Sequence, residues 1–373
     1  MSRTRVVVTG IGAVCPTGLD VASLADVLES GRRGPPRSSV PGRISGFRPE
    51  QYVHPNRLRR MDALSARAVA ASILAVRDAR LAEHTRSVHR PDTGVAFGTA
   101  YGCQETTLRY AQKLVEQGAY FTNPIDFPDS IDGAPAAHIA MELGLQGPST
   151  THVDGALSGE VSLWHAALAI QSGRATRMIA GAGDTLTHTL QVALTELGLV
   201  GGSPPGVASG APTQAYRASE GVAMLVLESA ESAGARGARC YAEILGVGAR
   251  TASACPPHRF PVDSASVVAA MHHALARAGV EPEQVDRISM AAGAAPDESD
   301  AEALAVRELG GRAWQDRSVA LAPTLGSFDA AGALRIAAAC VAVGRGGSDS
   351  PRRILHQAWS RGGQSLSILV GRA

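Results

Sequence analysis

One order of elements occurs twice along this chain of 373 residues, and this repeat limits the folds that the chain can adopt. In each half, patterns typical of buried strands and apolar helices follow one another as strand, helix, strand, turn, helix and strand. Buried strands that alternate with helices predict central sheets covered by helices. We therefore expect an α/β fold built from two similar halves, residues 1–235 and 236–373. The matching segments are Arg5–Gly12, Gly94–Gly98, Thr151–Ala169 and Ala223–Leu227 in the first half, and Cys240–Gly248, Arg287–Gly293, Val319–Val343 and Ser365–Val370 in the second.

Further stretches have the pattern of helices or the composition of loops. Residues 31–56 are rich in glycine, proline, arginine and serine, and residues 201–214 are of low complexity, so we expect surface loops at both places. Gly118 is a stop signal for the helix that precedes it. The helices are expected at Arg57–Leu81, Glu105–Gln117, Ala134–Leu143 and Val267–Gly279.

The segment Thr151–Ala169 predicts a short strand, a tight turn and an apolar helix. Gly155 and Gly159 suit a backbone bend and a close approach of the helix. Such a turn often lifts one side chain to the start of the helix, where free N–H groups stabilise a thiolate or an oxyanion. A nucleophile is expected at that place, and the residue there is Ala156.

This segment resembles the nucleophile elbow of the beta-ketoacyl synthases, which reads Thr-Ala-Cys-Ala-Ser-Gly. Ser158 and Gly159 match its end, and Ala156 stands where the family has its acyl-accepting cysteine. The stretch Arg5–Val14 resembles the opening strand of the same family, and the likeness extends over nearly the whole chain. The resemblance implies a thiolase-like fold of five layers, α-β-α-β-α, with two sheets and a shared central helix layer.

The resemblance also locates the positions of the family's two histidines and its lysine. The first motif, His-Gly-Thr-x-Thr-Pro, corresponds to residues 291–296 and puts Ala291 at the histidine. The second, Lys-Ser-x-x-Gly-His before Ala-Ala-Gly-Ala, puts Leu321 at the lysine and Gly326 at the histidine. In the C-terminal Gly-Phe-Gly-Gly loop, Arg361 takes the place of an apolar gate.

The four positions for chemistry are therefore degenerate. General acid–base groups each contribute about 10²–10⁴ in rate, and an oxyanion-hole donor contributes about 10²–10³. Losing all of them with the nucleophile leaves no route by the family's decarboxylative condensation. We expect this chain to be inactive on its own, to bind no cofactor or metal, and to keep the scaffold.

A family member without its cysteine resembles the chain length factors of type II polyketide synthases. The resemblance implies a heterodimer with an active ketosynthase, an acyl carrier protein that brings the growing chain, and a tunnel along the interface. The best-known members have glutamine at the position of Ala156, and the stretch Asn123–Pro128 looks more like synthases of reduced, polyene-type chains. The resemblance places the helix Glu105–Gln117 beside the tunnel, although ordinary core packing would explain its apolar residues equally well. Candidate tunnel or interface residues are Thr107, Tyr110, Ala111, Leu114, Phe127 and Asp154, the last with a structural hydrogen bond as its simplest role.

Two other classes of function stay open. One is an enzyme with relocated chemistry, such as an acyltransferase or a dehydratase, and the other is a scaffold that binds acyl carrier protein without a ketosynthase. Cys103 at a helix start could be a nucleophile, but no base accompanies it, so a structural thiol is expected. Ser158 does not lie in a Gly-x-Ser-x-Gly motif, and Cys255 with His258 is half of a metal motif. His138, His152, His165 and His188 are expected to stand singly.

Composition excludes several other classes of partner and site. The net charge of +1 gives no reason to expect nucleic acid or an anionic membrane as a partner. Gly10 and Gly12 are not followed by the third glycine of a dinucleotide motif, because Cys15 stands there. Five scattered cysteines fit reduced thiols, no apolar run reaches about 18 residues, and no signal peptide is evident, so a cytoplasmic protein is expected.

Overall fold

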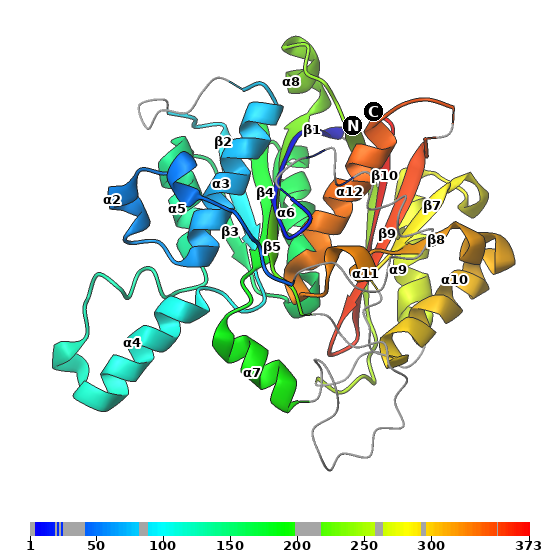
Figure 1. Cartoon of the computed structure of the whole chain (residues 1–373). Helices are drawn as coiled ribbons and strands as arrows, with labels where there is room; N and C mark the ends of the chain where they lie inside the picture. Colours follow the sequence, from blue (N-terminus) through cyan, green and yellow to red (C-terminus); the bar gives the residue numbers. More distant parts are fainter. Residues whose placement is uncertain are drawn as a thin grey trace.

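The computed structural model describes residues 4–18, 21, 24, 42–81, 89–197, 218–257, 264–291, 296–348 and 350–373, with the backbone alone at 296–301 and 323. Within these residues, ten strands form one sheet in the order β3-β2-β4-β5-β1-β6-β10-β9-β7-β8 (Figure 1). The strands are β1 (Val6–Val14), β2 (Thr93–Gly98), β3 (Ser149–His152), β4 (Arg177–Asp184), β5 (Gly221–Ser229), β6 (Ala242–Thr251), β7 (Arg287–Met290), β8 (Ser318–Ala320), β9 (Arg353–Ser360) and β10 (Gln364–Gly371).

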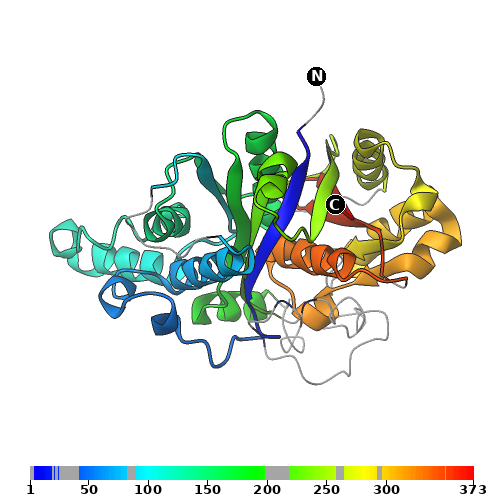
Figure 2. The same cartoon turned by 90° about the horizontal axis from the view of Figure 1, so that it is seen from above.

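The strand order contains the predicted duplication. Read from its outer edge inward, the first half runs β3-β2-β4-β5-β1, and the second runs β8-β7-β9-β10-β6 in the corresponding order. The directions also agree: β2 and β7 are parallel to both of their neighbours, and β5 and β10 are antiparallel to theirs. The halves meet where β1 pairs with β6, through Val7 opposite Glu243 and Val8 opposite Ala242 (Figure 2). The strand order confirms an α/β fold of two similar halves, and the boundary between residues 235 and 236 stays a prediction.

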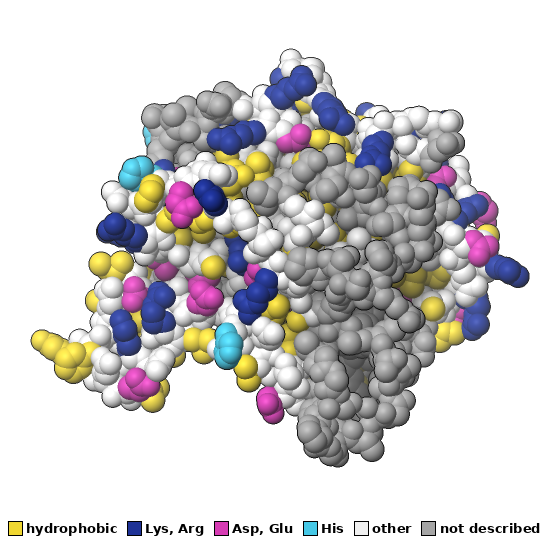
Figure 3. Space-filling model, in the orientation of Figure 1, with side chains coloured by type: hydrophobic (Ala, Val, Ile, Leu, Met, Phe, Trp, Pro, Cys, Tyr) yellow, Lys and Arg dark blue, Asp and Glu magenta, His cyan; other side chains and the backbone are white. Residues whose placement is uncertain are grey.

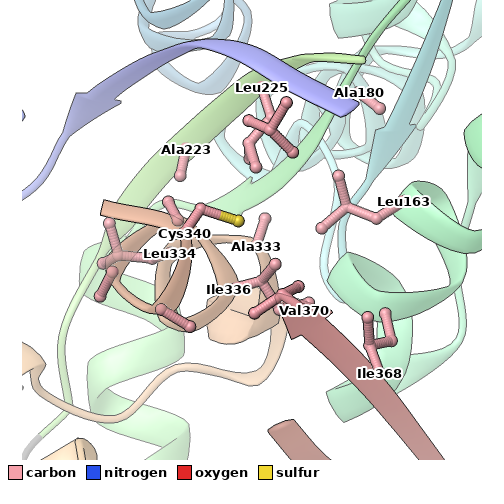
Figure 4. Packing of buried hydrophobic residues seen from close by; sticks show 14 of the residues in the cluster. Leu163, Ala180, Ala223, Leu225, Ala333, Leu334, Ile336, Cys340, Ile368 and Val370 are labelled. Carbon is pink, nitrogen blue, oxygen red and sulfur yellow. The ribbon is translucent and has the colours of Figure 1, made fainter. Parts of the chain in front are cut away.

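Helices cover both faces of each half-sheet. Helices α6 (Ser158–Gln171) and α12 (Gly332–Gly344) form a central layer, and their apolar side chains share one core with strands of both halves (Figure 4). Helices α3 (Ala63–Asp78) and α5 (Ala134–Leu143) cover the outer face of the first half. Helices α9 (Ala265–Ala278) and α10 (Pro296–Arg317) cover that of the second. The result is the expected thiolase-like arrangement of layers. The expectation of two separate sheets is wrong for the described residues, because the pairing of β1 with β6 joins the half-sheets into one sheet of ten strands.

The two Gly-x-Gly pairs allow helices to approach the strands closely. A Cβ atom added at Gly10 or Gly12 would lie 2.2 Å or 2.1 Å from a backbone oxygen of α3. At the equivalent Gly246 and Gly248, it would lie 2.1 Å or 2.0 Å from a backbone oxygen of α9. These glycines are therefore packing residues that recur in both halves, which explains a Gly-x-Gly pattern without a dinucleotide site.

The structure differs from the sequence-based helices and strands in several places. The single helix expected at Arg57–Leu81 is two helices, α2 (Pro55–Leu58) and α3, because the Asp62 carboxylate caps α3 by accepting a hydrogen bond from the Leu64 amide at 2.9 Å. Strand β9 and helix α7 (His188–Glu196) were not predicted. The expected loop at 201–214 lies outside the described residues. The remaining elements are η1 (Pro49–Gln51), α4 (Gln104–Gln117), η2 (Ala119–Phe121), η3 (Gly155–Leu157), α8 (Ala230–Ala235), η4 (Pro282–Gln284), α11 (Ala322–Leu325) and η5 (Asp329–Ala331).

Helix α4 and the short η2 that follows it form an arm that projects from the body of the first half (Figure 1). Gly118, with φ of 86°, ends α4 and turns the chain into η2. At the tip, Tyr120 is 93% exposed and Phe121 is 64% exposed, and Figure 3 shows hydrophobic side chains gathered there. In the part of the chain that the structure describes, no helix is both long and apolar enough to cross a membrane.

Candidate functional site

The predicted strand, turn and helix of the elbow are present as β3, η3 and α6. Gly155 has φ of 56°, a left-handed conformation that favours glycine, and places the half-buried Ala156 in the turn before α6. The Ser158 hydroxyl holds the turn: it accepts a hydrogen bond from the Asp154 amide at 3.0 Å and lies 2.9 Å from the Thr99 carbonyl oxygen. The geometry of an elbow is thus complete, with a methyl group at its apex.

The other three positions for chemistry are also buried and without polar side chains. Ala291 follows β7 and is 9% exposed, and its amide donates to the buried Glu302 carboxylate at 3.0 Å. Leu321 precedes α11 and is fully buried, and the buried Gly326 follows the same helix. Ala291 and Leu321 belong to the same core cluster as Leu157, the neighbour of Ala156. The described side chains at these positions fill space and provide no base.

Gly326 allows a second alignment with the family's Gly-His pair. Its φ of 81° favours glycine, which is the residue that the Lys-Ser-x-x-Gly-His motif has directly before the histidine. In that alignment, Gly326 keeps the motif's glycine, and Ser327 takes the histidine position. Neither alignment puts an imidazole there.

A fully buried polar network crosses from the elbow helix to the second half. The His356 ring on β9 lies with Nε2 2.8 Å from Oε1 of Glu160 in the first turn of α6, and with Nδ1 3.1 Å from Oγ of Ser289 on β7. The Glu160 carboxylate rests on Gly332, where an added Cβ would lie 2.1 Å from the carboxylate carbon. Because all three side chains are fully buried, the network ties the halves together and is closed to a substrate. In the sequence, the only signal of this network is Glu160, a charged residue within an apolar helix.

Asp184 organises the loops around the elbow. Its buried carboxylate accepts hydrogen bonds from the Thr99 hydroxyl at 2.7 Å and from the amides of Ala100, Tyr101 and Ala330 at 3.0, 3.2 and 3.0 Å. Burial raises the pKa of Asp184 to about 6, although the hydrogen bonds from Thr99 and Ala330 oppose this shift. The carboxylate therefore joins the ends of β2 and β4 to η5, and sequence reasoning did not identify it.

Cys103 has the properties of a structural thiol. Its side chain is fully buried before α4, and its Sγ lies 3.7 Å from the Ser65 hydroxyl. Burial, with a smaller contribution from the charge of Asp62, raises the pKa of Cys103 to about 12. At neutral pH almost no thiolate is present, so this cysteine is a poor nucleophile.

A cavity of about 530 Å³ lies between α4, α7 and the loop at residues 130–132. Among the predicted tunnel residues, Thr107 contributes to its wall. Tyr110 instead packs against Phe127, with ring centroids 5.8 Å apart, while Ala111 and Leu114 are exposed on the arm. The hydrogen bonds described at Asp154 are made by its backbone. The cavity is lined by Tyr101, Gln104, Thr107, Leu108, Ser130, Ile131, Asp132, Thr189, Leu190 and Ala193.

We expected each of the four histidines to stand singly, but three of them have a partner. His152 and His165 lie with their ring centroids 4.5 Å apart, and His138 lies 2.7 Å from the Asp129 carboxylate. The expectation is therefore wrong for these three. Ser158, whose hydroxyl is occupied by backbone groups, has no part in the His152–His165 pair. His258 lies outside the described residues, which contain no group of three or more potential metal ligands.

Comparison with known proteins defines the class of this fold and site. Models of the beta-ketoacyl synthase N-terminal and C-terminal domains match residues 3–233 and 241–346. The chain therefore belongs to the beta-ketoacyl synthase family. It is 29% identical over 336 residues to 3-oxoacyl-(acyl-carrier-protein) synthase 2 of Vibrio cholerae, covering 84% of this chain and 79% of that protein. The corresponding enzyme of Staphylococcus aureus is 29% identical over 300 residues, covering 76% of this chain and 72% of its own.

Solved structures show the same fold over the whole chain. The ishigamide ketosynthase/chain length factor superposes with a TM-score of 0.83 at 26% identity, covering 100% of both chains. A beta-ketoacyl synthase from Burkholderia phymatum superposes with a TM-score of 0.81 at 22% identity, covering 99% of this chain and 100% of that one. The second likeness speaks for the fold alone.

Proposed function

We propose that this chain is a chain length factor, the non-catalytic partner of an active ketosynthase in a type II polyketide synthase. One observation carries the proposal: the positions that resemble the family's cysteine, histidines and lysine hold Ala156, Ala291, Gly326 and Leu321. Ala291 and Leu321 are packed into the apolar core, where a thiol or base would be needed. The chain keeps the fold of the elbow but lacks its reactive groups. This combination is expected of a protein that was selected as a scaffold.

Two surfaces of the first half support a heterodimer with the ketosynthase. Strand β3 is at the end of the sheet, where one side of its backbone can pair with a further strand. The arm beyond it carries exposed apolar side chains, among them Val115 at 84% and Tyr120 at 93% exposure. Obligate interfaces of this kind bury about 2,000–5,000 Å² and are apolar. The ishigamide ketosynthase/chain length factor is a structural relative that is named for both components.

The arm and the adjacent cavity are our candidates for setting the length of the product. Thr107 lines the cavity, and Tyr110 packs on Phe127 at the side of α4, so both would border a tunnel that the partner completes. A closely packed wall limits chain length by excluding volume. An acyl carrier protein would deliver the growing chain, and the Asn123–Pro128 stretch favours a reduced, polyene-type product.

Co-expression with a candidate partner ketosynthase tests the proposal. We expect the two chains to co-elute as a heterodimer in size-exclusion chromatography and to yield polyketide only together. The purified chain alone should not consume malonyl thioester. Turnover by the chain alone would overturn the proposal and favour an acyltransferase or a dehydratase. Binding of acyl carrier protein without a ketosynthase complex would overturn it in favour of a scaffold.

A further inference from the structure

Two histidines and a tryptophan lie against the free edge of the sheet. Strand β3 pairs with β2 on one side, and within the described residues its other side has no neighbouring strand. Ser149 and Thr150 are exposed, and Val153 just beyond the strand is 51% exposed. A short strand edge of this kind is a template on which another chain can add a strand.

The histidines come from two elements that meet at this edge. His152 ends β3, and the exposed His165 lies on α6, with the two rings tilted by 57° at a centroid distance of 4.5 Å. The Trp164 ring stands edge-on to His165 at 5.8 Å. Nε2 of His152 also lies 3.1 Å from the Thr150 hydroxyl. Since Thr151 points to the α5 side, the alternation of a strand turns His152 toward α6.

Electrostatics at this place oppose a positive charge. Burial lowers the pKa of His152, the neighbouring His165 lowers it further, and the carboxylate of Asp154 acts in the opposite direction. On α5, at the other face of β3, the titratable side chains are paired elsewhere, His138 with Asp129 and Glu142 with Arg57. A second chain over the edge would remove more water from the pair and increase the cost of protonating it.

We propose that the His152–His165 pair makes docking of the ketosynthase on the β3 edge dependent on pH, so that the complex forms with neutral imidazoles and weakens when they are protonated. This inference rests on the proposed function, because the ketosynthase is the occupant of the edge. The reason is thermodynamic linkage. Docking buries the pair and makes its protonated form more costly, so a protonated pair must lose its proton before the chains bind. Binding therefore weakens at low pH. The partner surface that faces the pair must then be apolar or uncharged rather than basic.

The dissociation constant of the co-purified heterodimer, measured by dilution at pH 7.5, 6.5 and 5.5, tests this inference. If docking lowers the pKa of His152 by about one unit from near 6.5, the constant should rise up to about 5-fold from pH 7.5 to 5.5. The double variant His152→Gln/His165→Gln should bind at pH 7.5 and lose most of this rise. His272→Gln, which alters an exposed histidine on α9, is the matched control and should behave as the unmodified chain does.

The outcomes separate this inference from the function on which it rests. A heterodimer whose dissociation constant does not change with pH would overturn the inference and leave the proposed function standing. A rise that persists in the double variant would overturn the assignment to this pair. The absence of any complex at pH 7.5 would overturn both.

Discussion

The two halves of this molecule share one strand order but present different surfaces. When the five strands of each half are numbered along the chain, both halves have the order 3-2-4-5-1 with the same strand directions. Each half also packs a Gly-x-Gly strand against its outer helix. Of the 13 large hydrophobic side chains that are exposed among the described residues, 12 lie in the first half, and Leu304 alone lies in the second. Duplication thus determines the interior, while the proposed contact with a ketosynthase would account for the surface that differs.

Cutting the buried link between the halves should have the largest effect. His356→Leu would leave the Glu160 carboxylate fully buried without its partner, and breaking a buried pair in this way costs about 3–5 kcal/mol. We expect a marked loss of stability in chemical denaturation. Ser289→Ala is the control on the other side of the ring and should cost less, because it removes a neutral hydrogen bond. Equal stability of His356→Leu and the unmodified chain would contradict a role for the network in joining the halves.

Polar substitutions at the tip of the arm should come next. Tyr120→Ser with Phe121→Ser removes two exposed aromatic rings, and interface hot spots of this type contribute about 2 kcal/mol or more each. Titration with the ketosynthase should show affinity weakened about 30-fold if one ring is such a hot spot and about 1,000-fold if both are, with unchanged thermal stability of the isolated chain. Leu304→Ser makes the matched change in the second half and should leave affinity as it is. Equal losses of affinity from the two sets of substitutions would contradict a difference between the surfaces of the two halves.

The equivalent strands β4 and β9 end in different residues, Asp184 and Ser360, and only Asp184 can titrate. Measuring the free energy of unfolding against pH therefore tests a difference between the two halves. The folded pKa of Asp184, about 6, lies above the usual value for an unfolded chain, so its protonated form stabilises the fold. That contribution is complete near pH 4 and is lost as the pH rises to about 6. Relative to Asp184→Asn, the unmodified chain should lose about 2–3 kcal/mol of unfolding free energy over this interval.

Glu228 provides the opposite sign for the same experiment. Burial alone would raise the pKa of its carboxyl, but hydrogen bonds from Arg236 and Thr9 and the charge of Arg177 lower it. Stability from this group is therefore lost as the pH falls through the lowered pKa, below the interval in which Asp184 titrates.

For Asp184, the difference in unfolding free energy between the unmodified chain and Asp184→Asn is the decisive quantity. A difference that is constant from pH 4 to 6 would contradict the raised pKa of Asp184.

The smallest effect is expected on the product rather than on the protein. Tyr110→Ala would remove the ring that packs on Phe127 and should lengthen the polyketide made by the heterodimer if this wall limits the tunnel. Mass spectrometry of products gives the measurement. Gln112→Ala, on the exposed side of α4, is the control. Products of unchanged length from Tyr110→Ala would reject a tunnel role for this residue.

Local patterns in the sequence predicted most of the fold. The helix at Ala134–Leu143 has the expected bounds, because apolar periodicity and the glycine residues at its two ends determine them. Strand β9 was missed since His356 and Gln357 interrupt its apolar run, although both are fully buried. The break before α3 was missed because its cap, the Asp62 carboxylate, acts through a hydrogen bond that periodicity does not reveal.

The candidate site also has some features that local sequence patterns predicted and others that they did not. Motif positions predicted the elbow and its apex, Ala156, since the turn depends on residues that are neighbours in sequence. The links of Glu160 to His356 and of His152 to His165 join residues from separate elements, so no local pattern could predict them. The equivalence of Ala291, Leu321 and Gly326 to catalytic positions remains a prediction from motifs.

The open edge of β3 has a consequence for gene dosage. A subunit with an unpaired strand edge beside an apolar arm has two fates in the absence of its partner, pairing with its own copies or aggregation. Surplus synthesis would therefore be wasteful at best and toxic at worst. We expect such a gene to be translated in step with that of its partner, so that each new edge meets a matching strand soon after the ribosome releases it.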